Sequence, residues 1–372
     1  MKKKFFFSNI YKCIKLCAFL LLYGRIKKVT KVKDQIKIIT KKALFENSFF
    51  YKSYKIPNGR LYSNTVHDTA YIIGRYLIKD LSFQYRYKKN KQIKNGNIFE
   101  NIAFKKGTPS FIKKIKGNVL SMLIGGGGKK NYWHWIFDVL PKIAILEKSN
   151  LKCKPDYYLA PSLSQKFQLE SFKLLKIPSS KILSGEKFKH ITCDNLLTVD
   201  HPTVFKNNTP DAVLNIPLWI IKWLRKKFIK KSYIKRKNYK KIFINRESDS
   251  VLENRKIINN QEVRNFLSKL GFRSVTLSDY SFNEQVKIFN NAQFVIGLHG
   301  GGFANIIFSK QGTKIIEIQS KQNGNAILNL ANKCKLNYKR VSERNISDKL
   351  KYQNSHINVN LSNLKKVIFS YN

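Results

Sequence analysis

Acidic residues are scarce in this 372-residue sequence: 22 aspartates and glutamates stand against 71 lysines and arginines, a formal net charge of +49. Such an excess of positive charge usually indicates a protein that binds nucleic acid, an anionic membrane surface or phosphorylated ligands. Lysine is abundant along the whole chain, however, so a general drift in composition would give the same charge without any selected binding patch. The charge alone therefore assigns no partner.

Cysteine is also rare, and the five residues include no C-x-x-C pair. An odd, scattered set favours a reducing compartment and argues against a disulfide framework. The six histidines have no metal-ligand spacing with the cysteines, so no zinc site is predicted. The cysteines are Cys13, Cys17, Cys153, Cys193 and Cys334.

Long hydrophobic runs are absent from the amino-terminal region. The longest, Leu16 to Tyr23, lies between Lys15 and Arg25 and is much shorter than the about 20 residues of a membrane-spanning helix. No small-residue cleavage site follows it, which argues against a signal peptide. We interpret residues 1–48 as a basic amphipathic segment on the inner face of a membrane, which predicts a cytoplasmic, peripheral protein. The alternative is an ordinary first helix that packs on the core.

The chain is long enough, and with 43% hydrophobic residues apolar enough, for two domains. From residue 241 onward, strand and helix patterns alternate with short connections, which is typical of a parallel, doubly wound sheet. The expected strands are 241–246, 274–279, 293–298 and 313–319 with a last one near Tyr338, and the expected helices are 259–272, 281–292, 301–308 and 325–334.

The preceding half has a similar but less regular pattern. Strands are expected at 117–124, 155–160 and 191–199, and helices at 131–149 and 164–177. We predict an α/β protein with two Rossmann-like domains. The predicted division is an amino-terminal segment 1–48, an acceptor-side domain 49–228, a basic linker 229–240, a nucleotide-sugar-binding domain 241–342 and a tail 343–372. The lysine-rich segment 224–241 is either a solvated surface or a membrane-facing or interdomain element.

Three consecutive glycines follow the strand that ends at Leu298. In an open parallel sheet, ligands bind beyond the carboxyl ends of the strands. Gly300, Gly301 and Gly302 would leave bare backbone N–H groups for a pyrophosphate, and Asn305 would lie within reach of a ribose or phosphate. The alternative is a tight turn that uses glycine for a positive φ. The stretch is neither a G-x-G-x-x-G motif nor a Walker loop.

Polar side chains accompany this turn at the ends of neighbouring strands. Arg246 and Arg255 are predicted to hold phosphate through paired N–H groups, although Arg255 could instead form a surface salt bridge with Glu262. His299 is either a hydrogen-bond donor to a leaving group or a structural residue. Glu317 is either a ribose ligand or an exposed carboxylate at the sheet edge.

The stretch "NYWHWIFDVLP" (131–141) contains a second polar group. If it is helical, His134 and Asp138 stand at i and i+4 and share one face. A carboxylate is costly to bury on an otherwise apolar helix, so we predict Asp138 as a general base, with a hydrogen-bonded structural carboxylate as the alternative. Pro141 should disfavour helical geometry at Leu140 and either kink the helix or start a new one.

Aromatic residues flank this histidine. Trp133 and Trp135 would either stack on a sugar ring or fill the core, and we predict both, with Asn131, as acceptor-binding residues.

The stretches "NYWHWIFDVLP", "FINRESDSVLENRKIINNQEV" and "GLHGGGFANIIF" followed by "IIEI" together resemble, in order and spacing, the catalytic region of glycosyltransferase family 61. The resemblance covers about Gly117 to Gln319, and a familiar form of the pattern has alanine at Gly301 or Gly302. It implies two Rossmann-like domains that face a cleft (the GT-B arrangement) and inverting transfer from a nucleotide sugar in capsule or lipopolysaccharide synthesis.

This resemblance suggests roles for the predicted residues. The base would be Asp138, or His134 acting with it, and the anion site would combine the glycine turn with Arg246, Arg255 and His299. The partners would be a nucleotide sugar, a glycan or lipid-linked glycan acceptor and an anionic membrane surface, with no specific nucleic acid. Since no D-x-D triplet occurs, we expect activity without a metal or other cofactor. A noncatalytic scaffold of the polysaccharide machinery and a nucleic-acid-binding protein are the alternatives.

Overall fold

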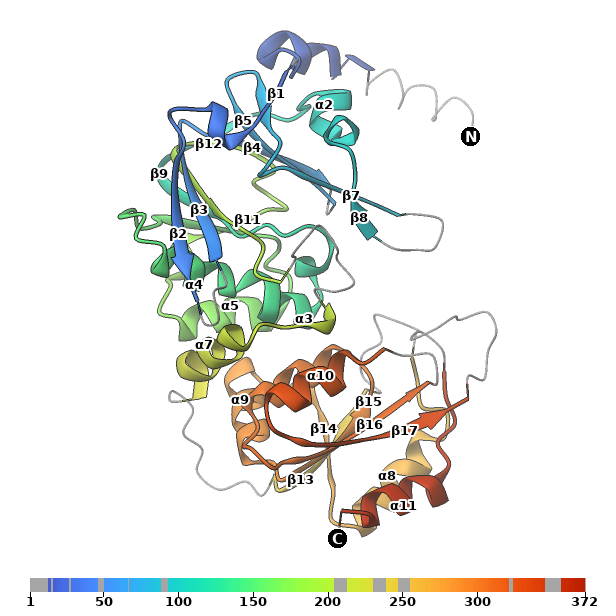
Figure 1. The fold of residues 1–372 in the computed structure, drawn as a ribbon. Coiled ribbons are helices and arrows are strands. Elements are labelled where there is room, and N and C mark those ends of the chain that lie inside the picture. The colour runs from blue at the N-terminus through green and yellow to red at the C-terminus, as the bar shows by residue number, and fades with distance from the viewer. Residues whose placement is uncertain are drawn as a thin grey trace, which may run out of the picture. The chain divides into compact units, whose positions relative to one another are not determined.

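Two β-sheets organise the chain, each in its own unit (Figure 1). The first unit comprises residues 1–168 and 177–212, and the second comprises 169–176 and 213–372. The computed structural model describes residues 13–14, 16–26, 28–45, 50–65, 67–87, 93–203, 213–229, 239–246, 255–320, 324–344 and 356–371. Most of the predicted linker, residues 230–238, lies outside the described residues.

In the described residues, the sheet of the first unit contains twelve strands. Its main parallel part consists of β12 (His190–Val199), β9 (Lys113–Ser121), β10 (Tyr157–Ala160) and β11 (Ile182–Ser184), in that order, and the short strands β1 (Lys28–Thr30) and β6 (Tyr76–Ile78) also pair in the parallel sense. The others are β2 (Ile39–Leu44), β3 (Phe50–Pro57), β4 (Arg60–Thr65), β5 (Asp68–Ile73), β7 (Phe83–Tyr87) and β8 (Ile93–Asn95).

The antiparallel part of this sheet was not predicted. Strands β3 and β4 both pair with β12 in the antiparallel sense, so the sheet is mixed rather than purely doubly wound. The Asn58-Gly59 turn between them is a strong hairpin signal. Here, however, it joins two strands that share β12 as a partner, and the N–H of Asn58 donates to the carbonyl of Asp194 on β12.

The helical elements of the first unit include two that adjoin the candidate site: η4 (Gly126–Lys129) and the run of α3 (Tyr132–His134), the π-helical η5 (Trp135–Val139) and α4 (Pro141–Lys148). Helix α5 (Lys166–Leu174) spans the boundary between the units. The others are η1 (Val32–Asp34), η3 (Ile98–Glu100), α2 (Ile102–Lys106) and η6 (Ser179–Lys181).

The second unit contains the predicted parallel sheet, which is confirmed. Its five strands are β13 (Lys241–Asn245), β14 (Arg273–Thr276), β15 (Phe294–Leu298), β16 (Lys314–Ser320) and β17 (Asn337–Glu343), in the order β14-β13-β15-β16-β17. Strand β15 is a continuous apolar run, and β16 is buried along almost its whole length, as expected for central strands that are covered on both faces. The chain moves outward from β13 to β14 and then returns past β13 to β15, which makes a topological switch point between β13 and β15.

Helices cover both faces of this sheet. Helices α8 (Asn260–Lys269) and α11 (Leu361–Phe369) lie on one face, and α9 (Phe282–Asn291) and α10 (Ala326–Lys333) lie on the other (Figure 1). Leu364 and Ile368 of α11 join the core beneath α8, so part of the predicted tail packs in this unit. Helix α7 (Leu218–Phe228), whose residues we assigned to the end of the first domain, also belongs to the second unit. The remaining elements are η8 (Leu277–Asp279) and η9 (Gly301–Phe308).

Candidate functional site

In the first unit, His134 and Asp138 form a hydrogen-bonded pair. Nδ1 of His134 lies 2.6 Å from Oδ2 of Asp138, so the predicted i,i+4 pairing is present. The side chain of Asp138 is 7% exposed and that of His134 is 28% exposed. The carboxylate thus lies in the interior, while the imidazole reaches the surface of its unit. In the described part of the chain, Nε2 of His134 has no hydrogen-bond partner.

The local sequence explains how this pair is placed. Asn131 caps α3, because its Oδ1 accepts a hydrogen bond from the N–H of Trp133 at 3.0 Å. The chain then widens into η5, where the N–H of Leu140 donates to the carbonyl of Trp135 at 3.1 Å. Pro141 occupies the first turn of a new helix, as one alternative predicted. Our expectation for Leu140 was wrong: its φ of −59° and ψ of −40° are helical, and the π turn accommodates the proline ring.

Both carboxylate oxygens of Asp138 are occupied. Oδ2 faces His134, and Oδ1 accepts a hydrogen bond from the hydroxyl of Thr203. Burial by itself raises the pKa of Asp138, but its bonds to His134 and Thr203 and the neighbouring His201 and His134 outweigh burial and lower the pKa below its usual value. Asp138 is therefore ionised at neutral pH and has no oxygen directed at a ligand. The arrangement indicates that Asp138 orients His134 rather than taking a proton itself.

Two further titratable groups lie near this carboxylate. His201 is half-buried, and burial of its ring lowers its pKa to about 4, so it is neutral at pH 7. Lys142 donates from Nζ to the carbonyl of Leu123 at 2.7 Å, and burial lowers its pKa to about 7. Sequence reasoning missed Thr203, His201 and Lys142. They lie far from Asp138 in the sequence or on the following helix, and no spacing rule links them to it.

The two tryptophans are core residues. Trp135 is fully buried, and Trp133 is 6% exposed and packs edge-on against Phe137. A buried indole offers no face to a sugar, so the positions of both rings contradict the predicted acceptor-binding role and match its alternative. Asn131 is exposed, but its side-chain oxygen serves the helix cap.

In the second unit, the switch point of the sheet brings two arginines to one carbonyl group. Arg246 directly follows β13, and His299 directly follows β15, its parallel neighbour. Nη1 of Arg246 and Nη1 of Arg255 donate to the backbone oxygen of His299 at 3.1 and 3.4 Å. Arg255 forms no salt bridge with Glu262, whose carboxylate accepts instead from Asn259 within the described residues.

A cavity of about 290 Å³ opens beside these arginines. Burial and the charge of Arg246 lower the pKa of Arg255 to about 10, so both guanidiniums are charged at neutral pH. The cavity combines cations at its side with apolar residues from the sheet. Its lining is Phe243, Ile244, Arg246, Arg255, Lys256, Ile257, Ile258, Asn260, Gln261 and Leu298.

Close approach, rather than backbone strain, explains two of the three glycines. Neither Gly300 nor Gly302 has a φ in the left-handed region, which excludes the positive-φ alternative for them. A methyl group on Gly300 would lie 2.8 Å from Nη1 of Arg246, and one on Gly302 would lie 2.8 Å from Cδ1 of Leu277. Gly301 begins η9, the predicted helix, which is a 3₁₀ helix. Gly300 thus lets the turn lie directly against Arg246, and Gly302 lets it lie against Leu277.

The imidazole of His299 is hydrogen-bonded to a buried carboxylate. Its Nδ1 is hydrogen-bonded to Oε1 of Glu317, and Oε2 of Glu317 accepts from the hydroxyl of Tyr338. Glu317 is fully buried within β16, so it is neither a ribose ligand nor an exposed carboxylate, and both predicted alternatives were wrong. Burial and the adjacent Glu317 raise the pKa of Tyr338, which therefore stays protonated and donates.

Asn305 also points inward. It is fully buried, and its Nδ2 donates to Oε1 of Gln285 at 3.0 Å and to the carbonyl of Gly302 at 3.3 Å. It therefore braces the glycine turn instead of contacting a ligand. Among the described residues, no group of three or more His, Cys, Asp or Glu side chains is placed to hold a metal ion.

His134, Asp138, Arg246, Arg255 and the glycine turn all lie within a stretch that matches a known protein family. Residues 132–316 match the family model for Glycosyltransferase 61. A 96-residue stretch is 29% identical to the EGF domain-specific O-linked N-acetylglucosamine transferase of Gallus gallus. That match covers 24% of this chain and 18% of the chicken protein, so it spans less than a fifth of that relative.

Proposed function

The chain belongs to glycosyltransferase family 61 through its domain at residues 132–316, and we propose that it is an inverting glycosyltransferase that moves a sugar from a nucleotide-sugar donor to a glycan acceptor. The observation that carries this proposal is the His134–Asp138 pair, an imidazole oriented by a buried, ionised carboxylate. The relative from Gallus gallus is named as an N-acetylglucosamine transferase, which supports sugar transfer without identifying the donor sugar here.

His134 is the proposed base. Because Asp138 accepts the hydrogen bond from Nδ1, the proton-free nitrogen of the neutral imidazole is Nε2. Nε2 would take the proton of the acceptor hydroxyl as that oxygen attacks the anomeric carbon from the face opposite the leaving diphosphate. Asp138 would stabilise the imidazolium that forms. The new C–O bond replaces the bond to the diphosphate oxygen, which inverts the anomeric configuration.

The second unit would hold the leaving diphosphate. Arg246 and Arg255 converge on the carbonyl of His299, and a guanidinium presents five N–H donors in a planar fork. Such paired N–H groups suit phosphate oxygens at the switch point, where ligands of doubly wound sheets bind. The cavity of about 290 Å³ beside them has apolar walls for the base of a nucleoside and polar side chains for its ribose.

Several further elements of the proposal extend the family assignment. We propose the GT-B arrangement, with the donor on the second unit and the acceptor on the first, and a role in the synthesis of capsule, lipopolysaccharide or another surface polysaccharide. Because the sequence has no D-x-D triplet, transfer is expected to need no added metal.

Peripheral attachment to an anionic membrane face is also part of the proposal. Phe19 packs edge-on against Phe111, and this contact ties the helical residues 16–23 to the first unit. Leu21 and Leu22 are 87% and 61% exposed there, which suits insertion of an amphipathic segment at an interface. In the described chain, no helix is long and apolar enough to cross a bilayer. Co-sedimentation with phosphatidylglycerol vesicles that is unchanged in a Leu21→Glu, Leu22→Glu variant would refute the attachment.

The transferase proposal is tested by release of nucleoside diphosphate from a panel of UDP-, GDP- and CMP-linked sugars, with CMP release measured for the last. We expect turnover of at least one donor, retained in excess EDTA, and a fall of about 10²–10⁴-fold in a His134→Gln variant. No turnover of any donor by the folded wild-type protein, or equal turnover by the variant, would overturn the proposal. Loss of turnover in EDTA that manganese restores would overturn its metal independence.

A further inference from the structure

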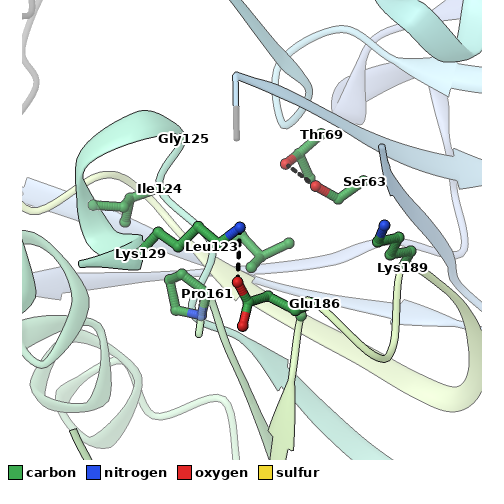
Figure 2. Close-up of a pocket in the computed structure, with 10 residues that line it drawn as sticks. Ser63, Thr69, Leu123, Ile124, Gly125, Lys129, Pro161, Glu186 and Lys189 are labelled. Carbon is green, nitrogen blue, oxygen red and sulfur yellow. Dashed lines mark hydrogen bonds and ion pairs between the residues drawn. The ribbon is translucent and has the colours of Figure 1, made fainter. Parts of the chain in front are cut away.

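A second cavity, of about 180 Å³, lies wholly within the first unit (Figure 2). It opens where the parallel strands end: Leu123, Ile124 and Gly125 follow β9, Pro161 follows β10, and Gly185 with Glu186 follows β11. This is the edge of a parallel sheet at which ligands bind. The other lining residues are Ser63, Thr69, Lys129 and Lys189.

The cavity and the proposed base share one short turn. Gly125 and Lys129, at the two ends of η4, line the cavity. Gly127, between them, lies so close to His134 that a methyl group there would be 2.1 Å from the Cδ2 atom of the imidazole. The cavity and the imidazole of His134 therefore contact residues of the same short turn.

The polar groups of the cavity suit a hydroxyl-rich ligand. Nζ of Lys129 and Oε1 of Glu186 are 2.7 Å apart, and each side chain remains more than a third exposed. Oε2 of Glu186 accepts from the hydroxyl of Ser162 at 3.1 Å, which fixes the carboxylate. The hydrogen bond from Lys129 lowers the pKa of Glu186, so the carboxylate is charged and accepts hydrogen bonds. The pair thus offers a donor and an acceptor side by side, the arrangement that two neighbouring hydroxyls of a sugar require.

The other lining residues form a second polar group and an apolar surface. Figure 2 shows Ser63 and Thr69 joined to each other, apart from the Lys129–Glu186 pair. Leu123, Ile124 and Pro161 offer the carbon surface on which the C–H face of a sugar ring can rest. Ser63 and Thr69 belong to β4 and β5, outside the residues that match the family model.

We propose that this cavity is the acceptor subsite and holds one sugar ring of the glycan that receives the transferred sugar, with its hydroxyls on Lys129 and Glu186. This inference rests on the proposed transferase function. It assigns acceptor selection partly to Ser63 and Thr69, that is, to a part of the chain that the family domain does not include. A volume of about 180 Å³ restricts the subsite to a single ring and leaves the rest of the glycan outside.

The test is saturation-transfer-difference NMR on the full chain with p-nitrophenyl glycosides of glucose, galactose, N-acetylglucosamine and glucuronic acid. We expect saturation of the sugar-ring protons for at least one glycoside, reduced at least fivefold in both Glu186→Gln and Lys129→Met. Lys130→Met is the matched control, because Lys130 is the exposed neighbour of Lys129 and does not line the cavity; it should retain the wild-type signal. Absence of ring-proton signal for all four glycosides, or a signal that survives both lining substitutions, would overturn the inference.

A parallel measurement separates this inference from the transferase proposal. Hydrolysis of the donor by water needs His134 and the second unit but no acceptor sugar, so the share of donor turnover that goes to the glycoside rather than to water should fall in both lining variants and stay at the wild-type value in Lys130→Met. Normal hydrolysis with sugar binding insensitive to the substitutions would remove only the acceptor subsite. Sugar binding that depends on Glu186 and Lys129 in a protein that turns over no donor would leave a sugar site and remove the transferase.

Discussion

Asp138→Asn isolates the charge of the buried carboxylate while keeping its shape. In the native protein Asp138 orients His134 across 2.6 Å and would stabilise the imidazolium that forms when His134 takes a proton. Two unit charges about 4 Å apart interact by about 4 kcal/mol at an effective dielectric constant of about 20. Loss of that interaction from the transition state corresponds to a fall of about 10³-fold in kcat. This lies within the range of about 10²–10⁴-fold for general-base catalysis.

The same substitution should leave the donor site intact. We therefore expect kcat for nucleoside diphosphate release to fall by about three orders of magnitude while KM for the donor changes less than about threefold. Thr203→Val is the matched control: it removes the hydrogen bond to Oδ1 of Asp138 but keeps the carboxylate charge, so kcat should fall by less than about tenfold. Thermal melts establish that each variant is folded.

A double variant provides an independent readout. If Asp138 acts only through His134, adding Asp138→Asn to His134→Gln should lower kcat no further, because the carboxylate then has no imidazole to orient. A folded Asp138→Asn protein that keeps more than a tenth of wild-type kcat, or a double variant that is much slower than His134→Gln alone, would refute the assignment of His134 as the base oriented by this carboxylate.

Three further predictions concern the donor site and acid stability. Gly300→Ala should displace Arg246, whose Nη1 would lie 2.8 Å from the new methyl group; donor KM should rise about tenfold with little change in Tm, whereas Gly324→Ala, at an open position, should change neither. Arg255→Lys keeps the charge and loses the paired N–H groups, so donor KM should rise about tenfold at unchanged kcat, and an unchanged KM would remove Arg255 from the site. Burial lowers the pKa of His201 and of His190 to about 4. In the unfolded chain both imidazoles are protonated below about pH 6.5, whereas in the folded chain they are protonated only below about pH 4. The free energy of unfolding should therefore be fully present above pH 6.5 and fall by about 1.4 kcal/mol per pH unit for each histidine as pH drops from 6.5 to 4, and a flat chemical-denaturation profile over that range would contradict both burials.

Much of the second unit could be predicted because each strand and helix carries its own periodicity. The buried strand β15 is an apolar run, β16 contains three isoleucines, and Ser281 and Glu284 form a capping box that starts α9. Such signals are local, and the parallel order follows from their alternation. The antiparallel strands of the first unit were missed because strand pairing through β12 joins segments about 140 residues apart, which no local pattern encodes.

The candidate site was predictable in residue type but not in the direction of each side chain. Arg246, Arg255 and Gly300 come together because parallel strands end at the same edge of a sheet, a rule that can be applied to sequence. Glu317 was misplaced because a carboxylate in a strand is ordinarily costly to bury. Its burial is compensated by His299 and Tyr338, and Tyr338 lies on the next strand, β17, where only the three-dimensional register reveals it.

The π turn at Trp135–Val139 fixes how many residues can separate His134 from Asp138. The i+5 hydrogen bond from Leu140 to Trp135 accommodates one residue more than an α-helical turn would. Deletion of a single residue between His134 and Asp138 would rotate one about the helix axis by about 100° relative to the other, while α4 could keep its buried face. Insertions and deletions in this segment should thus reduce turnover far more than stability. A related chain with a different number of residues between the histidine and the aspartate would be one in which the histidine is not the catalytic base.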